Sequence, residues 1–310
     1  MNYDNLLILT AKNDPTFAKF MIEKGFHLEH IWRNDHFSNR KYNILKIFNL
    51  HHLLYGFKKE QIKKYDRIIL SETSKMSAVA KTILQWNPLI DLKVYMWNIV
   101  RDSSINEVKN LQKLGVEVYT FDKQDCKNYG LKYNPQMYPF DIKKLKKEDN
   151  KYECYFCAAD KDRIDDLIKL KETLDKNNIS YKFRVLLKKH KKYNFNDKNI
   201  NNIIFMRKSI PYEQIIKEVQ YSKAIVEIVQ KGQIGFTWRV HESLFYNKKL
   251  ITTNNTLREY DFYNPNNIFI IDNNYDEIKE FLELPYIKMD DKIKDRYIYK
   301  AWLNNFFIKQ

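Results

Sequence analysis

Short apolar runs alternate with amphipathic stretches along most of this chain, and that alternation limits the folds it can adopt more than any other feature. In the first half, five runs have the length and composition of buried strands, and they cover residues 5–10, 27–32, 66–70, 92–99 and 116–121. The run 92–99 is largely apolar, as is typical of parallel strands covered on both faces. Strands alternating with helices predict a doubly wound α/β sheet over residues 1 to about 140.

The second half repeats this alternation. Six further strands are expected at residues 153–159, 181–187, 202–206, 224–229, 249–253 and 267–271. The lysine-rich segment 140–151 is interpreted as the link between two domains, and residues 290–307 are expected to form one final amphipathic helix. We therefore predict a first domain at 1–145, a second at 151–288, and a C-terminal helix within 289–310.

Residues 221–254 carry the clearest functional signal. The strand at 224–229 is followed by a loop that holds Gly232 and Gly235, two of only six glycines in the chain. Thr237 can cap a helix that starts near Arg239. Open α/β sheets bind ligands at the carboxyl ends of their strands, and a helix N-terminus there suits phosphate. The loop and helix together predict an anion site, although a plain turn is the simpler alternative.

Two charged residues follow directly on this helix. Arg239 offers a forked donor that matches phosphate oxygens. Glu242, one turn later, could accept hydrogen bonds from the neighbouring hydroxyls of a ribose. The alternative is a solvated pair at spacing i, i+3.

Residues 232–244 and 248–254 resemble the donor-site segment of bacterial GT-B glycosyltransferases that make capsule and lipopolysaccharide, and further pieces of the chain resemble the same proteins. The resemblance rests on GQIGFTWRVHESL at 232–244, KKLITTN at 248–254, YDFYNP at 260–265, NIFI at 267–270, YMWN at 95–98 and TFDKQDC at 120–126. It implies two Rossmann-like domains that face each other across a cleft, with the C-terminal helix crossing back to the first. The second domain would bind a nucleotide-sugar, and the first a glycan or lipid-linked acceptor.

The resemblance also assigns the donor site. Lys161 or Arg163 would reach the diphosphate, and the turn containing Arg207 and Ile210 would lie under the base. The remaining expected donor-site residues are Gly232, Gln233, Gly235, Thr237, Arg239 and Glu242. The glycine common in the loop after the second domain's first strand is absent, and Ala158 and Ala159 stand there instead.

The first domain would supply the base and the acceptor site. Asp14, Glu72 and Asp102 are candidate catalytic bases, and helix capping is the plainer interpretation of Asp14. Glu72 could instead support a helix cap at Thr73 or Ser74. Expected acceptor-site residues are His36, Arg40 and Asn98.

The net charge of +15 suggests anionic partners. Nucleic acid, a membrane surface and phosphorylated small molecules would each satisfy it. Lysines cluster at 143–151 and 188–192, but no nucleic-acid-binding module is recognisable, so no nucleic-acid partner is expected. A basic nucleic-acid-binding protein and a sugar-nucleotide epimerase remain the alternatives. No Asp-x-Asp motif stands in a clear context, so no essential metal or cofactor is expected beyond the donor.

The cysteines and the N-terminus indicate the compartment. Cys154 and Cys157 lie in an expected strand without the partners of a zinc site, and buried free thiols are the better interpretation. No signal peptide and no apolar run of ~18 residues is present. A cytoplasmic protein is expected, with peripheral contact to the inner membrane allowed.

Overall fold

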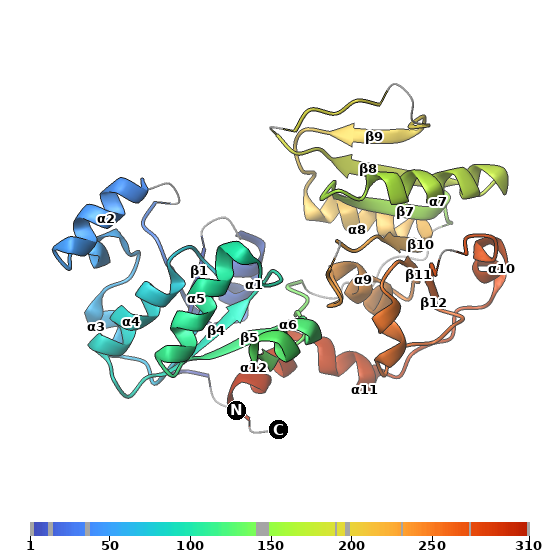
Figure 1. Ribbon diagram of the computed structural model, residues 1–310. Coiled ribbons are helices and arrows are strands. Elements are labelled where there is room, and N and C mark those ends of the chain that lie inside the picture. Colours follow the sequence, from blue (N-terminus) through green and yellow to red (C-terminus); the bar gives the residue numbers. More distant parts are fainter. Residues whose placement is uncertain are drawn as a thin grey trace. The chain divides into compact units, whose positions relative to one another are not determined.

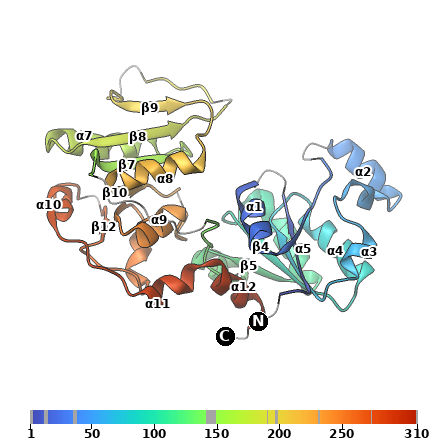
Figure 2. The ribbon, with the colours of Figure 1, turned by 180° about the vertical axis from the view of Figure 1, so that it is seen from behind.

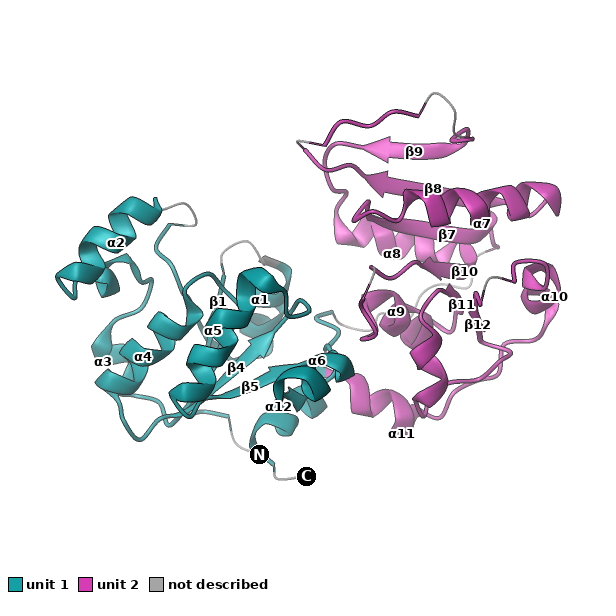
Figure 3. Ribbon diagram, in the orientation of Figure 1, with its two compact units in different colours: residues 1–140, 299–310 teal, residues 141–298 magenta. Residues whose placement is uncertain are grey.

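The computed structural model describes residues 3–11, 15–34, 38–140, 149–189, 191–195, 199–230, 232–272 and 274–308. The chain divides into two compact units (Figure 3). The first unit contains residues 1–140 and 299–310, and the second contains residues 141–298. Each unit is built on one six-stranded parallel sheet.

The first sheet has the strand order β2-β1-β3-β4-β5-β6 (Figure 1). Its strands are β1 (Leu6–Thr10), β2 (His27–His30), β3 (Arg67–Ser71), β4 (Asp91–Met96), β5 (Glu117–Thr120) and β6 (Lys132–Tyr133). The five predicted strands are confirmed. β6 was not predicted, because two residues are too few to show a hydrophobic period.

Helices cover both faces of this sheet. They are α1 (Pro15–Glu23), α2 (Asn39–Ile47), η1 (His51–Leu54), α3 (Lys59–Ile62), α4 (Met76–Trp86), α5 (Asp102–Lys113), α6 (Lys123–Tyr129) and α12 (Tyr299–Phe307). Alternate residues of β1 belong to different cores, since successive strand side chains point to opposite faces. Leu7 and Leu9 share a core with α4 and α5, whereas Leu6 and Ile8 share one with α1 and α12.

The C-terminal segment differs from the prediction of one continuous helix. It is divided into α11 (Asp291–Lys294), η3 (Asp295–Tyr297) and α12. Tyr297 belongs to the second unit, where its hydroxyl donates to Asp261 and its ring meets Phe236. Trp302 and Phe306, in contrast, are buried in the core of the first unit. The chain therefore leaves the second unit at residue 298, because the apolar residues on either side of that point pack into different cores.

The second sheet has the order β12-β11-β10-β7-β8-β9. Its strands are β7 (Tyr152–Ala159), β8 (Tyr181–Leu186), β9 (Ile203–Met206), β10 (Ser222–Glu227), β11 (Lys249–Thr252) and β12 (Ile268–Ile270), as predicted. Its helices are α7 (Ile164–Lys176), α8 (Tyr212–Gln220), α9 (Trp238–Tyr246), η2 (Asn255–Glu259), α10 (Ile278–Glu283) and α11. Figure 2 shows the same elements from behind. Cys154 and Cys157 are buried free thiols in β7, as predicted.

Two helix ends lie beside residues with a left-handed backbone. α2 ends at Ile47, two residues before Asn49, which has φ 56°. Neither Thr73 nor Ser74 caps α4, whose N-cap position is Lys75. Among the described residues, no helix is long and apolar enough to cross a bilayer.

Candidate functional site

Each sheet has one point where the strand order reverses. In the first sheet it lies between β1 and β3, and in the second between β7 and β10. Connections leave these neighbouring strands toward opposite sides, which opens a crevice at their carboxyl ends, and ligands of open α/β sheets bind there. In the second unit, the loops at this point contain Lys161, Arg163 and the glycine-bearing segment 232–237. The residues predicted to bind the diphosphate therefore lie together at the carboxyl ends of the neighbouring strands β7 and β10.

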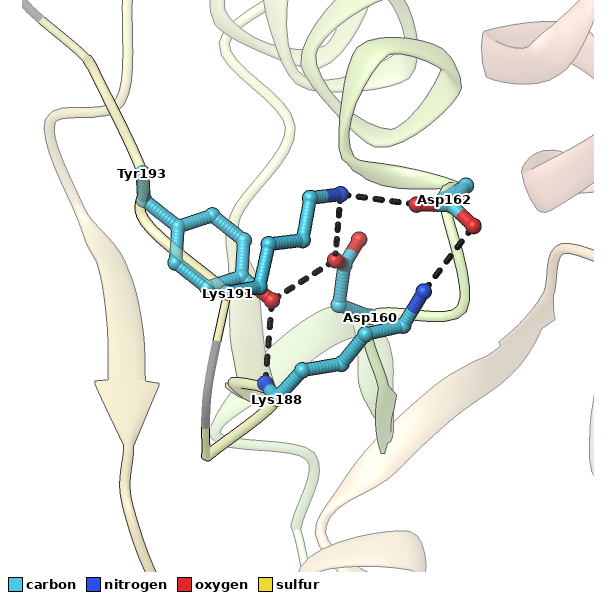
Figure 4. Close-up of polar contacts among 5 residues, drawn as sticks. All are labelled: Asp160, Asp162, Lys188, Lys191 and Tyr193. Atoms are coloured by element: carbon cyan, nitrogen blue, oxygen red, sulfur yellow. Dashed lines mark hydrogen bonds and ion pairs between the residues drawn. The ribbon is translucent and has the colours of Figure 1, made fainter.

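The loop after β7 is held by ion pairs to the loop after β8 (Figure 4). Lys191 Nζ lies 3.2 Å from Asp160 Oδ2 and 2.7 Å from Asp162 Oδ1. Lys188 Nζ lies 2.9 Å from Asp162 Oδ2, and the Tyr193 hydroxyl donates to Asp160 Oδ2 over 2.8 Å. Two lysines of the basic cluster at 188–192 are therefore paired with carboxylates.

Arg163 connects the loop after β7 to the end of β10, at the reversal point of the second sheet. Its Nη1 donates to the carbonyl oxygen of Ile228, at the end of β10, over 2.5 Å. Burial lowers the pKa of Arg163, and the carboxylates of Glu227 and Asp160 oppose that shift. Arg163 Nε is buried and has no hydrogen-bond partner among the described residues. A buried donor without a partner is costly, so this Nε destabilises the site as it stands.

A buried carboxylate fixes the start of α9. Thr237 is the N-cap, and its hydroxyl accepts from the backbone N–H of Arg239 over 3.1 Å. The same hydroxyl donates to Glu227 Oε1 over 2.6 Å, and Thr252 Oγ1 donates to Glu227 Oε2 over 2.7 Å. Burial raises the pKa of Glu227, and these two hydroxyls oppose the shift. The N-terminus of α9 is therefore held firmly at the crevice.

Side chains that follow β11 hold the glycine-bearing loop in place through hydrogen bonds. Asn254 Nδ2 and Thr256 Oγ1 both donate to the carbonyl oxygen of Ile234, over 3.1 and 2.8 Å. Gln233 Nε2 donates to the carbonyl oxygen of Gly235 over 2.9 Å. Gly232 is exposed and has φ 82°, a conformation that favours glycine. The loop is thus preformed.

Arg239 and Glu242 form a buried ion pair and are not a solvated pair. The Arg239 side chain is 15% exposed and that of Glu242 is 0% exposed. Tyr212 of α8 donates its hydroxyl to the other oxygen of Glu242 over 2.7 Å. Burial raises the pKa of Glu242, and Arg239 and Tyr212 oppose that shift. The structure offers no exposed surface of Glu242 to a ribose, so the direct contact expected from sequence does not fit this geometry.

The remaining donor-site predictions lie at the same sheet edge. Arg207 and Ile210 follow β9, the outermost strand, and Arg207 is exposed whereas Ile210 is half-buried. Lys161 is exposed in a left-handed conformation with φ 39°. The segment that contains Arg207 and Ile210 leads into α8, whose first residue, Tyr212, has its ring 6.2 Å from that of Trp238 at the start of α9.

The first unit has a cavity of about 690 Å³ at its own reversal point. Its lining comes from the carboxyl ends of β1, β3 and β4 and from the starts of α2, α4 and α5. The lining residues are Thr10, Ala11, Asn39, Ser71, Glu72, Thr73, Ser74, Lys75, Met76, Trp97, Asn98, Ser103, Ser104 and Glu107. Hydroxyl, amide and carboxylate groups therefore surround the space.

Glu72 is the best-placed acid in this cavity. Its Oε2 accepts from the backbone N–H groups of Trp97 and Asn98 over 3.0 and 2.9 Å, and from Asn98 Nδ2 over 3.1 Å. Burial raises the pKa of Glu72, and these donors oppose the shift. The structure thus brings together one predicted base and one predicted acceptor residue, Asn98.

The other predictions for the first unit are not gathered here. Asp102 is exposed at the first position of α5 and does not line the cavity, and Arg40 is exposed on α2. Asp14 and His36 lie outside the described residues. Of the three candidate bases, Glu72 alone is placed in the cavity by the described part of the chain.

Sequence reasoning missed Glu227, Asp160 and Tyr212. Glu227 had a detectable signal, because it is a single acid at the end of an otherwise apolar strand. The pairing of Asp160 with Lys191 and of Tyr212 with Glu242 spans 31 and 30 residues, so no local pattern announces either contact. In the described ranges, no group of three or more His, Cys, Asp or Glu side chains could hold a metal ion.

Comparisons with known proteins identify the fold. No protein-family model and no curated protein sequence matches this chain. An α-glucosyltransferase (AGT) in complex with UDP matches with a TM-score of 0.56 and 11% identity, over 97% of this chain and 95% of that one. A glycosyltransferase from Rickettsia africae ESF-5 matches with a TM-score of 0.55 and 12% identity, over 97% and 92%. TarM matches with a TM-score of 0.53 and 13% identity, over 85% and 58%.

These identities are low, so the likeness establishes the fold and not the activity. The two parallel α/β sheets and the matched structures confirm the predicted GT-B fold. Capsule or lipopolysaccharide synthesis is not indicated by any of the three matches.

Proposed function

We propose that this protein is a glycosyltransferase that takes a sugar from a nucleoside-diphosphate sugar. The observation that carries the proposal is the reversal point of the second sheet, where a capped helix N-terminus, a preformed glycine-bearing loop and two partly buried arginines meet. A helix N-terminus and forked guanidinium donors both suit a diphosphate. The GT-B fold, shared with an α-glucosyltransferase solved with UDP, supports a nucleotide at this place.

In the proposed reaction, an acceptor hydroxyl forms a bond to the anomeric carbon while the bond from that carbon to the diphosphate breaks. The hydroxyl proton passes to a base, for which Glu72 is the candidate. Arg163, the N-terminus of α9 and Arg239 stabilise the negative charge that develops on the leaving diphosphate. Glu242 orients Arg239 through their ion pair and does not contact the ribose. Lys161 contributes a further cation at the mouth of the site.

We further propose that the cavity of the first unit binds a sugar acceptor, such as a growing surface polysaccharide or its lipid-linked precursor. Its lining holds two carboxylates, Glu72 and Glu107, and one cation, Lys75. This charge balance disfavours a polyanion such as nucleic acid, whereas serine and threonine hydroxyls and Asn98 match sugar hydroxyls. One matched structure holds a 13-mer DNA, so DNA is the acceptor to test against.

Ligand-dependent melting tests the donor site. A ligand that binds only the native state stabilises it by about 2.7 kcal/mol at 100 times its Kd. We expect nucleoside diphosphates of one base class, tested first with UDP, to raise the melting temperature, and Lys161→Ala to reduce that rise. Lys169→Ala, an exposed lysine on α7, is the matched control and should behave like the parent. A flat response to every nucleotide at millimolar concentration would refute the donor site.

Glu72→Gln tests the base. The amide retains the shape of the side chain but cannot take a proton, so transfer should fall about 100-fold or more while UDP binding stays unchanged. Normal turnover by this variant would remove Glu72 from the reaction. Transfer to DNA in preference to glycans would overturn the proposed acceptor class.

A further inference from the structure

The first unit exposes several large apolar side chains on α2 and η1 that line neither candidate site. Residues 39–54, which include these two helices, are called the α2–η1 surface below. Its exposed large apolar side chains are Ile44 (49%), Ile47 (77%), Phe48 (67%), Leu50 (42%) and Leu53 (48%). Elsewhere in the described chain, such side chains are dispersed over both units, namely Ile22, Leu89, Ile204, Leu284, Ile287 and Ile308. Single exposed apolar residues are ordinary, but a contiguous group marks a binding surface.

The geometry of α2 places three of these side chains on one face. Ile44, Ile47 and Phe48 stand at i, i+3 and i+4, so they lie on the same side of the helix. The opposite side is anchored by Tyr42, which is 1% exposed, with its ring against that of Trp32 at 6.4 Å. Figures 1 and 2 both place α2 at the periphery of the first unit, with no helix or strand of that unit beyond it. The apolar face is therefore preformed and accessible within its unit.

Cations flank this apolar face. Arg40, Lys41 and Lys46 are exposed on α2, and Lys58 and Lys59 follow η1. Residues 38–59 contain no Asp or Glu. A surface that combines exposed Ile, Leu and Phe with Lys and Arg is complementary to a bilayer interface bearing anionic headgroups. A second copy of the chain would instead bring like charges together, which disfavours self-association through this surface.

We propose that the α2–η1 surface docks the protein on a membrane that contains anionic lipids. The helix lies in the plane of the interface, and Ile47 and Phe48 enter the region between headgroups and acyl chains. α2 is about 13 Å long, so one face of it can meet the bilayer along its whole length. Each cation near an anionic surface strengthens binding about fivefold, which makes the docking reversible and sensitive to salt.

Vesicle flotation with the purified full-length chain tests this directly. We expect the protein to float with phosphatidylcholine vesicles that contain phosphatidylglycerol, and much less with phosphatidylcholine alone or at high salt. Ile47→Asp and Phe48→Asp should each weaken partitioning at least about tenfold. Lys41→Gln with Lys46→Gln should weaken it only on the anionic vesicles. Leu89→Asp is the matched control, because Leu89 is an isolated exposed leucine of the same unit, and it should float like the parent.

Four results would overturn the proposal. The first three are failure of the parent to float with anionic vesicles, flotation of Phe48→Asp equal to the parent, and conversion of a dimer to a monomer by Phe48→Asp without vesicles. All the replaced side chains are exposed, so the melting temperature should not change. A lower melting temperature of Phe48→Asp would mean that Phe48 packs inside the protein, and this would also overturn the proposal. Flotation needs no nucleotide, so its outcome is separate from that of the proposed function.

Discussion

Breaking the buried pair between Arg239 and Glu242 should destabilise the second unit strongly. Glu242→Leu leaves the buried guanidinium without its anion, and Arg239→Met leaves the buried carboxylate with only the Tyr212 hydroxyl. Removing one partner of a buried ion pair costs about 3–5 kcal/mol. In a unit of this size, 1 kcal/mol corresponds to roughly 2–4 °C, so each single variant should melt about 6–20 °C below the parent.

The double variant distinguishes the interaction between Arg239 and Glu242 from the cost of leaving one of them buried without its partner. Well-packed apolar residues often replace a buried ion pair at little cost, so Arg239→Met with Glu242→Leu should melt close to the parent. The energies of the single variants would then be strongly non-additive. Arg258 and Asp272 form an Arg–carboxylate pair in the same unit with side chains 47% and 52% exposed, and Arg258→Met should cost less than about 1 kcal/mol.

Thermal melts of the full-length parent and these four variants supply the measurement. If Arg239→Met and Glu242→Leu melt within about 1 °C of the parent, the pair is solvated and the burial argument fails. The same outcome would restore the interpretation in which Glu242 is open to a ribose. UDP binding by the double variant then tests Arg239 separately from the fold, because that variant is expected to remain folded.

Two further predictions concern the first unit. Burial raises the pKa of Asp125 from 3.8 to about 6, so ionised Asp125 destabilises the native state. The asparagine of Asp125→Asn can still accept the hydrogen bond from Val100 N–H. The variant should melt above the parent at pH 7, and this rise in melting temperature should shrink below pH 6 and vanish below pH 4. A rise that does not change with pH would contradict the argument. A Cβ on Gly56 would lie 2.2 Å from the His30 carbonyl oxygen, so Gly56→Ala should melt well below the parent. Gly25→Ala, whose Cβ meets nothing within 4 Å, carries only the strain of a left-handed φ of 85° and should lose less; equal losses would contradict the close approach.

The sequence predicts strands well because each one is a short apolar run that ends at turn residues. Helix boundaries near caps are less predictable, since they depend on backbone geometry. Lys75, for example, holds a left-handed N-cap with φ 61°, although threonine and serine stand just before it. Thr237 is predicted correctly because its side chain performs the capping itself.

In the candidate sites, too, features set by one local segment are predictable and features set by distant partners are not. The glycine-bearing loop and the start of α9 follow from one continuous segment, and so does their place at the carboxyl end of a strand. The burial of Glu242 does not, because it depends on Tyr212, which lies 30 residues earlier. Glu72 was expected to act as a base or to support a cap, but the groups it binds, the backbone of Trp97 and Asn98, belong to the end of the neighbouring strand. Long-range partners decide whether a charged residue is available to a ligand.

The charge balance of the second crevice leads to a last prediction. The numbers of positive and negative side chains are nearly equal there. The cations are Lys161, Arg163, Lys188, Lys191 and Arg239, and the carboxylates are Asp160, Asp162, Glu227 and Glu242. An incoming diphosphate must therefore compete with carboxylates that already hold the lysines. Asp162 is the most accessible competitor, since its side chain is 69% exposed and it binds both Lys188 and Lys191.

Asp162→Asn should therefore increase the affinity for nucleotide. Asparagine tolerates the left-handed backbone at this position, where φ is 63°, so the loop should keep its shape. Removing one negative charge near a diphosphate is worth about 1 kcal/mol at a surface, which corresponds to roughly fivefold tighter binding at low salt and less at high salt. Calorimetric titration with UDP measures this, and Asp165→Asn, an exposed acid in the first turn of α7, is the control. Equal or weaker binding by Asp162→Asn would mean that the diphosphate does not approach the lysine pair, because a phosphate near Lys188 and Lys191 cannot avoid the field of that carboxylate.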